Sequence, residues 1–378
     1  MMKKIGILSA LSLLICLILA AAPSALGLPT LPSGKENPLP ILFPELNTKP
    51  APSWVVEGLR ATYYATVDQG ARDGKPQVGD ALIQTDVVAL EGSFAATSTV
   101  SYVRSPLGLF RPLPGGGFGS VVPAGCGDFW CSPEVLAKVP EGDGGDLSVI
   151  RGPVEVAGST FQAVRLEVKR TGIRYAMTYD AETGLLLLHR YDILSSDGAT
   201  TETGIISLRN LREVDIPWTG GTSPNWLRAG QTTSYLGETV FEIPGTVPNP
   251  FPVNLRAEVV SVSSESSIIK WTAPGEGGGS IPYYAASGVR QLMGFWLPAT
   301  ALAIDEVGDV DADPDTGLLI SVIQNDRNGI VFRETNGRDY QRLITYEKGT
   351  GKLLGSYEEK LTEAFTSTVQ KTVVELTA

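Results

Sequence analysis

The sequence contains an internal repeat that spans most of its length. Four groups of residues recur in the same order, at offsets of 166 to 172 positions. The matched groups are Trp54, Gly58 and Tyr63 with Trp226, Gly230 and Tyr235; Phe129 and Trp130 with Phe295 and Trp296; Gly142 and Asp143 with Gly308 and Asp309; and Tyr179, Thr183 and Gly184 with Tyr346, Thr350 and Gly351. Because repeated units fold alike, we predict two tandem β-rich domains, at residues 54–216 and 224–378.

Residue composition in both halves favours β-strands. Val, Ile and Thr are concentrated in segments 85–90 and 98–103 and in their counterparts 257–262 and 267–272, with short polar turns between them. The 42 Gly and 26 Pro residues supply the turns that such a fold needs. We therefore predict a mainly β protein of two tandem antiparallel curved sheets, each an open half-barrel of seven or eight strands.

Two local motifs predict a hairpin and one short helix in each unit. Asp180 and Gly184 enclose a turn typical of a hairpin, because Asp opens a type I turn and Gly adopts the left-handed conformation that closes it. Ser132 followed by Pro133 is the N-terminal signature of a helix. Residues 298–303 are the counterpart of that helix in the second unit.

The N-terminus predicts export. Lys3 and Lys4 precede an apolar run at residues 5–22, and small residues follow at Ala25 and Gly27, which is the order of a signal peptide at 1–27. A retained membrane anchor is the alternative, because the run is just long enough to span a bilayer. No later segment has 18 uninterrupted apolar residues. We therefore expect an extracellular, cell-surface or periplasm-like location, with no transmembrane anchor after cleavage.

Residues 28–53 are rich in proline, which disfavours helices and central strands. The segment is predicted to be an extended linker that tethers the folded part. An arm packed along the first domain is the alternative, because Leu39, Ile41, Leu42 and Phe43 could anchor it.

The net charge argues against nucleic acid as a partner. The formal charge is -11 at pH 7, and an acidic surface repels phosphate backbones. No cluster of Lys and Arg with interleaved aromatic residues offsets this repulsion.

Cys126 and Cys131 are the cysteines that remain after signal cleavage, and an exported protein meets oxidising conditions. We predict a disulfide between them. Their counterparts at an offset of 166 are Leu292 and Leu297, so the fold does not require the bond. A redox site is the alternative, although thiol-disulfide oxidoreductases more often carry two cysteines separated by two residues.

The single histidine, His189, offers one route to a catalytic triad, but no Gly-x-Ser-x-Gly motif accompanies it. Aligned at an offset of 166 it falls on Gly355, so it is predicted to be an incidental strand residue. No catalytic residues are assigned, and we expect a protein that is not an enzyme.

Acidic residues crowd one loop of the second unit. Asp309, Asp311 and Asp313 alternate as in the first half of a calcium loop, because Ca²⁺ takes several carboxylate oxygens. Pro314 and Ile320 then stand where an EF-hand needs Gly and Glu. A solvated acidic turn is the favoured interpretation, with calcium as the only cofactor considered.

The repeated tryptophans have matched apolar neighbours, which favours core packing at Trp54, Trp130, Trp226 and Trp296. Trp218 and Trp271 lie outside the matched groups and are predicted to be surface aromatic residues.

The hairpin at Tyr179–Leu187 and the aromatic and helical segment at Phe129–Leu136 resemble parts of the LolA/RseB-like superfamily, which includes the outer-membrane lipoprotein carrier. The resemblance covers about 40 residues per unit. It implies a convex, unclosed β-sheet with helical cover that binds lipids or acylated proteins on its concave face. It carries no specific site residues across.

These observations together favour an exported cell-envelope or secreted protein that binds a lipid, an acyl chain or an envelope protein without catalysis. A structural cell-surface spacer is the first alternative, in which the two units act as rigid modules. An extracellular polysaccharide hydrolase is the second, and it would need two carboxylates facing each other in a cleft.

Overall fold

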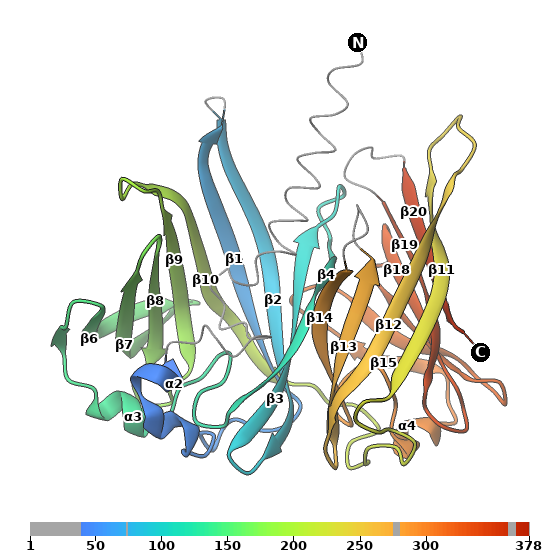
Figure 1. Cartoon of the computed structure of the whole chain (residues 1–378), viewed down its shortest axis with the longest axis horizontal. Helices are drawn as coiled ribbons and strands as arrows, with labels where there is room; N and C mark the ends of the chain where they lie inside the picture. Colours follow the sequence, from blue (N-terminus) through green and yellow to red (C-terminus); the bar gives the residue numbers. More distant parts are fainter. Residues whose placement is uncertain (1–38, 73–74, 275–279, 362–367, 378) are drawn as a thin grey trace. The chain divides into compact units, whose positions relative to one another are not determined.

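The computed structural model describes residues 39–72, 75–274, 280–361 and 368–377. These residues form two open antiparallel sheets of ten strands each, as the sequence predicts for the fold class (Figure 1). The first sheet comprises β1 (Leu59–Arg72), β2 (Lys75–Glu91), β3 (Phe94–Arg104), β4 (Phe110–Pro123), β5 (Gly142–Asp143), β6 (Leu147–Val156), β7 (Ser159–Arg170), β8 (Ile173–Asp180), β9 (Leu186–Leu194) and β10 (Thr200–Glu213). The second comprises β11 (Thr232–Glu242), β12 (Pro250–Val262), β13 (Ser266–Pro274), β14 (Ser280–Gly288), β15 (Gly308–Ala312), β16 (Leu319–Asn325), β17 (Ile330–Thr335), β18 (Tyr340–Tyr346), β19 (Leu353–Leu361) and β20 (Val369–Leu376).

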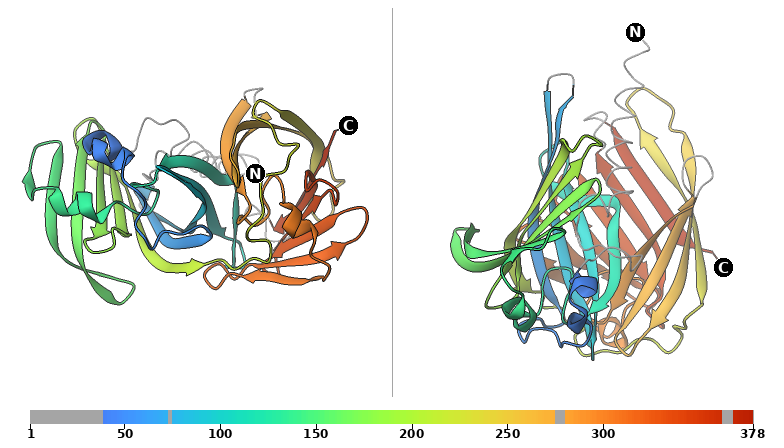
Figure 2. Two further views of the ribbon diagram at one scale, coloured as in Figure 1. Left: turned by 90° about the horizontal axis from the view of Figure 1, so that it is seen from below. Right: turned by 60° about the vertical axis from the view of Figure 1, so that its left-hand side comes forward.

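The two sheets have the same strand order. In each half the first strand pairs with the last, β1 with β10 and β11 with β20, so that four N-terminal strands extend a sheet of six C-terminal ones. Figure 2 shows that each sheet curves strongly. The sequence predicts fewer strands than the structure has, because a strand as short as β5 carries no alternation of apolar and polar residues.

The predicted helices are present and short. Helix α3 spans Pro133–Lys138, with Ser132 at its N-cap position and Val135 and Leu136 buried. Its counterpart α4 spans Ala299–Leu302. No helix among the described residues is long and apolar enough to cross a membrane.

Equivalent side chains hold the same hairpin in each half, which explains why Trp and Tyr recur. The indole Nε1 of a tryptophan and the hydroxyl of a tyrosine donate to backbone carbonyls around the turn. These bonds are Trp54 to Thr183 at 2.8 Å, Trp226 to Thr350 at 2.8 Å, Tyr63 to Leu186 at 3.1 Å, and Tyr235 to Leu353 at 3.1 Å. The recurring aromatic residues therefore fix β8–β9 and β18–β19 to the strands that begin each unit.

The glycine that closes each of these turns has no room for a side chain. Gly184 has φ of +76° and Gly351 has φ of +72°, in the left-handed region that favours glycine. A Cβ added at Gly184 would lie 1.8 Å from the carbonyl oxygen of Cys131, and one at Gly351 would lie 2.2 Å from that of Leu297. The hairpin prediction is confirmed, and the close approach explains why both positions are glycine.

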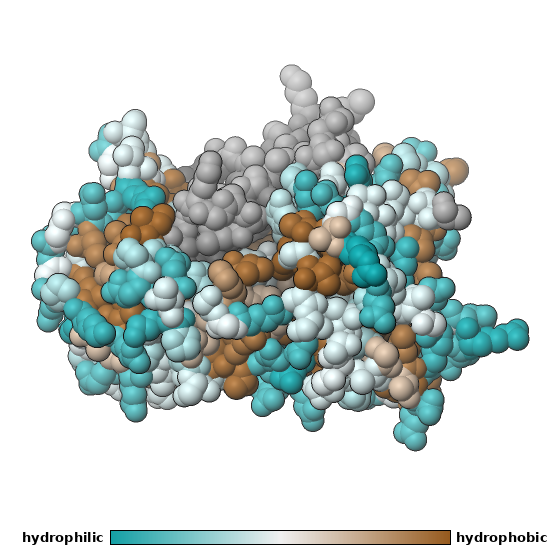
Figure 3. Space-filling model, turned by 60° about the horizontal axis from the view of Figure 1, so that its bottom comes forward, coloured by the Kyte–Doolittle hydropathy of each residue, from teal (hydrophilic) through white to brown (hydrophobic). Residues whose placement is uncertain are grey.

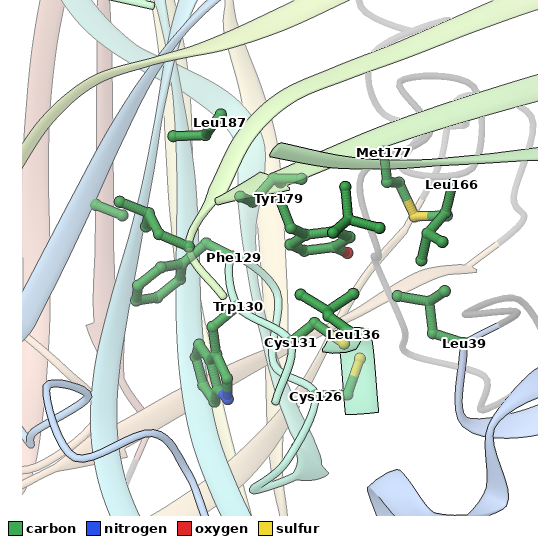
Figure 4. Packing of buried hydrophobic residues seen from close by; sticks show 14 of the residues in the cluster. Leu39, Cys126, Phe129, Trp130, Cys131, Leu136, Leu166, Met177, Tyr179 and Leu187 are labelled. Carbon is green, nitrogen blue, oxygen red and sulfur yellow. The ribbon is translucent and has the colours of Figure 1, made fainter. Parts of the chain in front are cut away.

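The first sheet encloses one apolar core. Figure 4 shows Phe129, Trp130, Leu136 and Tyr179 packed in this cluster. The second sheet has two clusters, one around Trp296 and the other around Trp218. Trp218 was predicted to be a surface residue, and this is wrong: its side chain is fully buried and packs edge-to-face on Phe332 at 5.6 Å.

The described part of the proline-rich segment is not an extended tether. Residues Leu39–Leu42 form α2 and Pro44–Asn47 form the 3-10 helix η1. Leu39 and Leu46 are buried in the core of the first sheet, so this part is the packed arm that the sequence leaves as an alternative. Proline allows these helices because it stands near their first turns. The remainder of the segment and the predicted signal peptide lie outside the described residues.

The compact units do not follow the sequence halves. One unit contains Tyr102–Gly119, which is the end of β3, the turn and most of β4, together with Val214–Ala378. Within it the Arg111 guanidinium donates to the carbonyl of Leu361, and the Asn336 side-chain amide donates to the carbonyl of Phe110 at 3.3 Å. The domain boundaries predicted from the repeat, 54–216 and 224–378, therefore stay predictions.

Candidate ligand-binding site

Strand register shows which side chains share the inner face of the first sheet. Residues directly opposite one another on neighbouring strands point to the same side. One such line, the His189 row, consists of Val149, Leu166, Met177, His189, Ile206, Ala65 and Ala81. Val149, Leu166, Met177, Ile206 and Ala65 belong to the apolar core, so the row faces the interior.

His189 is the one polar side chain in its row. It is 1% exposed, and neither ring nitrogen has a hydrogen-bond partner among the described residues. Burial lowers the pKa of the imidazole from 6.5 to about 4, because an apolar environment disfavours the charged form. The ring is therefore neutral at physiological pH and offers one donor and one acceptor, neither of which the protein uses.

Two tyrosines border His189 on the next line of the same face. The ring of Tyr175 lies 6.1 Å from that of His189. Tyr191 is opposite Tyr175 on β9, and its hydroxyl donates to the Glu202 carboxylate at 2.8 Å. A Cβ at Gly204 would lie 2.0 Å from the Tyr191 ring, so glycine there lets the ring lie flat on the sheet. An aromatic border next to an unpaired imidazole suits a ligand that is apolar but carries one polar group.

The second sheet has an equivalent line in which serine replaces histidine. The Ser356 row consists of Val322, Phe332, Ile344, Ser356, Val374, Gly237 and Val253. Met177 and Ile344 precede the same Thr-Tyr pair, and their partners on the next strand are His189 and Ser356. The counterpart of His189 is therefore Ser356, not Gly355. The offset of 166 that aligned His189 with Gly355 is wrong for β9. This strand follows the hairpin at Tyr179–Gly184, which aligns with the second half at an offset of 167.

The next line differs between the sheets in its charge. In the first sheet it contains Val168, Tyr175, Tyr191, Gly204 and Val67; in the second it contains Glu334, Arg342, Glu358, Thr372 and Thr239. Equivalent positions of one scaffold are thus apolar and aromatic in one copy and charged in the other.

The charged groups in this line of the second sheet pair with one another, although the Nε of Arg342 has no hydrogen-bond partner among the described residues. Arg342 forms an ion pair with Glu334 at 3.2 Å, and the Tyr340 hydroxyl donates to the same carboxylate at 2.6 Å. Burial opposes the charge of Arg342, but the carboxylates of Glu334 and Glu358 raise its pKa above the ordinary value. Tyr102, in the same compact unit, also raises this pKa. The carboxylate of Glu334 therefore has partners within the chain, whereas neither ring nitrogen of His189 has one among the described residues.

A second buried polar group of the first sheet is Asp128. The Thr97 hydroxyl donates to its Oδ2, and that of Ser120 lies 3.3 Å from the same oxygen, while Oδ1 has no partner among the described residues. Burial raises the pKa of Asp128 from 3.8 to about 6, although both hydrogen bonds lower it. Its hydrogen-bond partners are hydroxyls, which do not provide the paired carboxylate of a glycosidase. Asp128 was not predicted from the sequence, because a single Asp in a Gly-rich loop matches no functional motif.

Cys126 and Cys131 are both buried, and their side chains lie next to one another (Figure 4). They form an antiparallel bridge flanked by backbone hydrogen bonds from Gly127 to Trp130 and from Ser132 to Gly125. Such a pair has Cα atoms about 4.5 Å apart, within the range that a disulfide spans. A hydrogen bond with Cys126 and burial raise the pKa of the Cys131 thiol well above its usual range. A nucleophilic role is therefore disfavoured, and the disulfide stays a prediction.

The acidic loop has local structural partners. Asp309 accepts a hydrogen bond from the Ser321 hydroxyl at 2.8 Å. Asp313 accepts hydrogen bonds from the backbone N–H groups of Asp315 and Thr316, so it caps the turn. In the described part of the chain, no three His, Cys, Asp or Glu side chains could hold a metal ion together. The structure gives no support to calcium at Asp309, Asp311 and Asp313, which stays a sequence-based hypothesis.

Comparison with known proteins adds little to these observations. No protein-family model matches the chain, and no curated protein matches its sequence. A MucA/MucB complex from Pseudomonas aeruginosa aligns at 12% identity and a TM-score of 0.22, covering 88% of this chain and 90% of that one. A DUF3598-family protein of unknown function from Nostoc punctiforme aligns at 10% identity and a TM-score of 0.17, covering 85% and 96%. Similarity this low carries no argument about function, which rests on the residues themselves.

Proposed function

We propose that this protein is an exported, non-enzymatic binding module that holds a lipid acyl chain on the inner face of the first sheet. The ligand lies along the His189 row, with its carboxyl or ester group at the imidazole. The observation that carries the proposal is the unsatisfied pair of ring nitrogens of His189 within an otherwise apolar row.

Leaving both nitrogens unpaired costs free energy. A buried polar group without a partner destabilises a fold by about 1–3 kcal/mol. A protonated carboxyl group would supply both an acceptor and a donor and recover this energy, whereas an ester carbonyl would satisfy the ring N–H alone. The acyl chain of the ligand would meanwhile remove its own apolar surface from water by packing against Met177 and Ile206, which flank His189 on the neighbouring strands.

The open sheet of the first half agrees with what the LolA/RseB-like resemblance implies, which is a concave face that takes lipid or acylated partners. An acylated protein of the cell envelope would present the same chemistry as a free lipid. Export through the signal peptide at 1–27 would place the protein where such ligands occur.

The proposal is tested with a fluorescent long-chain fatty acid titrated into the purified protein. In the His189→Leu variant the row becomes wholly apolar. The acyl chain of the ligand then keeps its apolar contacts, but its carboxyl group loses the hydrogen bond to the imidazole. We expect the dissociation constant of the fatty acid to rise about tenfold. Ser356→Ala is the matched control, because it removes the equivalent polar group of the second sheet, and its affinity should equal that of the wild type.

Three results would contradict this function. The first is wild-type protein that neither binds the probe nor retains lipid in native mass spectrometry. The second is equal affinity of the wild type and His189→Leu. The third is a loss confined to Ser356→Ala, which would move the site to the second sheet. Thermal melts of each variant establish that the fold is retained.

A further inference from the structure

The outer face of the first sheet exposes arginine and isoleucine side chains together. Successive residues of a strand point to opposite faces, so this face lies on the other side of the sheet from the His189 row. Strand register places Ile150 beside Arg165 in one line of the outer face, and Arg190 beside Ile205 in the next line. Arg174 belongs to the line after that. All five side chains are exposed, and together they are called the arginine face.

The carboxylates of this region lie beneath the arginines. Glu167 forms ion pairs with Arg165 at 3.1 Å and with Arg174 at 3.7 Å, and Asp192 forms one with Arg190 at 3.0 Å. The side chains of the arginines are 44% exposed or more, whereas those of the two acids are 16% exposed or less. Each guanidinium group has five N–H donors, so donors that these ion pairs do not use remain available to a partner.

Exposed apolar residues alone would not mark the arginine face as a binding surface. On the face shown in Figure 3, too, hydrophobic residues lie in patches among hydrophilic ones. The distinguishing feature is the charge, because the chain as a whole has a formal charge of -11 and here cationic groups lie outermost. Arginine is enriched at protein interfaces. A bilayer of anionic lipid is disfavoured, because the acidic remainder of the chain would repel it.

A complementary surface is present on the same chain, in the acidic segment 305–309 that leads into β15. Residues 291–326 contain no basic residue. Asp305 and Glu306 are exposed, and their carboxylates have no hydrogen-bond or ion-pair partner among the described residues. Val307, which follows them, is 61% exposed. The segment therefore offers unpaired carboxylates beside an exposed aliphatic side chain, which is the complement of the arginine face in charge and in apolar character.

We propose that the arginine face binds the acidic segment of a second copy of this chain. The guanidinium groups donate to the carboxylates of Asp305 and Glu306 of the second copy, and Val307 packs on the exposed isoleucine side chains. The two surfaces are different, so the contact is heterologous. Each pair of copies then leaves one surface of each kind unused, and further copies can add to it.

Sedimentation equilibrium of the purified protein tests the proposal. We expect the average mass to rise with protein concentration at low ionic strength, and to fall to that of the monomer at about 1 M salt, where the screening length is about 3 Å. Arg165→Glu and Glu306→Lys should each raise the dissociation constant about tenfold, because each places like charges in the contact. Arg228→Glu is the matched control, since it reverses an exposed arginine outside both surfaces.

A mixture of the Arg165→Glu and Glu306→Lys proteins separates this contact from other modes of association. The first variant keeps its acidic segment and the second keeps its arginine face, so one contact can form between them. We expect a 1:1 dimer that does not grow, because the other two surfaces are disabled. Thermal melts establish that both variants fold. Fatty-acid binding by Arg165→Glu should equal that of the wild type, because the substitution lies on the opposite face of the sheet.

Three results would overturn the proposal. The first is wild-type protein that stays monomeric at low ionic strength, or a mixture that does not dimerise. The second is an equal loss in Arg228→Glu, which would attribute the association to net charge. The third is binding of phosphatidylglycerol vesicles that depends on Arg165 in a protein that does not self-associate, which would make anionic lipid the partner of the arginine face.

Discussion

His189 and Asp128 are both buried, and burial moves their pKa values in opposite directions. The pKa of His189 falls to about 4, and that of Asp128 rises to about 6, so burial favours the neutral form of each group. The neutral form is the one that an apolar interior tolerates. A sequence shows neither shift, because both depend on neighbours such as Thr97 and Met177 that lie on other strands.

Asp128 predicts a stability that falls as pH rises. The folded-state pKa is above the unfolded value of 3.8, so its contribution is fully present below 3.8 and is lost as pH passes through about 6. The shift corresponds to about 3 kcal/mol. We expect the wild type to lose on this order of stability between pH 4 and pH 8, measured by urea unfolding. Asp128→Asn cannot ionise and should lack this loss; an identical pH profile in the variant would contradict the argument.

The β8–β9 and β18–β19 hairpins show how far local sequence can predict an element. Asp180 and Gly184 encode the turn on their own, and the structure agrees. The sequence could not show that the turn of each half is also clamped by Trp54 or Trp226, since that contact joins residues more than 120 positions apart. The repeat indicated that the two tryptophans have a structural role, but only the structure identifies the carbonyl groups to which they donate.

The turn glycines can be tested by adding one methyl group. Gly184→Ala and Gly351→Ala should each destabilise the protein by roughly 2–4 kcal/mol, because the Cβ would overlap a backbone carbonyl. Gly158→Ala is the control: its φ is +78°, but nothing lies within 4 Å of the added Cβ. Only the conformational cost of about 1 kcal/mol is expected there. Denaturant midpoints compare the three variants, and equal losses would show that the close approach has no effect.

At the scale of the whole molecule, the two copies share a scaffold and differ in what lines it. The fold class, the helices and the aromatic core were predictable from the repeat, because recurring residues report what the scaffold needs. The residues that line the inner face of each sheet were not predictable, because strand register is needed to recognise that Tyr175 and Arg342 occupy equivalent positions. Aligning the two halves by a constant offset also hid the correspondence of His189 with Ser356.

The β3–β4 hairpin should couple energetically to the C-terminal strands. The Ser105 hydroxyl donates to Asp339 within the unit formed by 102–119 and 214–378. A double-mutant cycle of Ser105→Ala and Asp339→Ala should give a coupling energy of about 1.5 kcal/mol, typical of a buried hydrogen bond to a charged group. The cycle is measured by urea unfolding. Strictly additive losses would mean that the bond does not contribute.

The separation of these partners bears on how the protein is made. Ser105 and Asp339 are 234 positions apart, so the hairpin leaves the ribosome long before its binding partner exists. At synthesis rates of about 5–20 residues per second, the delay is on the order of 10–50 s. During that interval the hairpin has none of its final contacts with β17–β19. Completion of this unit therefore waits for the C-terminal strands, and chaperones have a defined window in which to act.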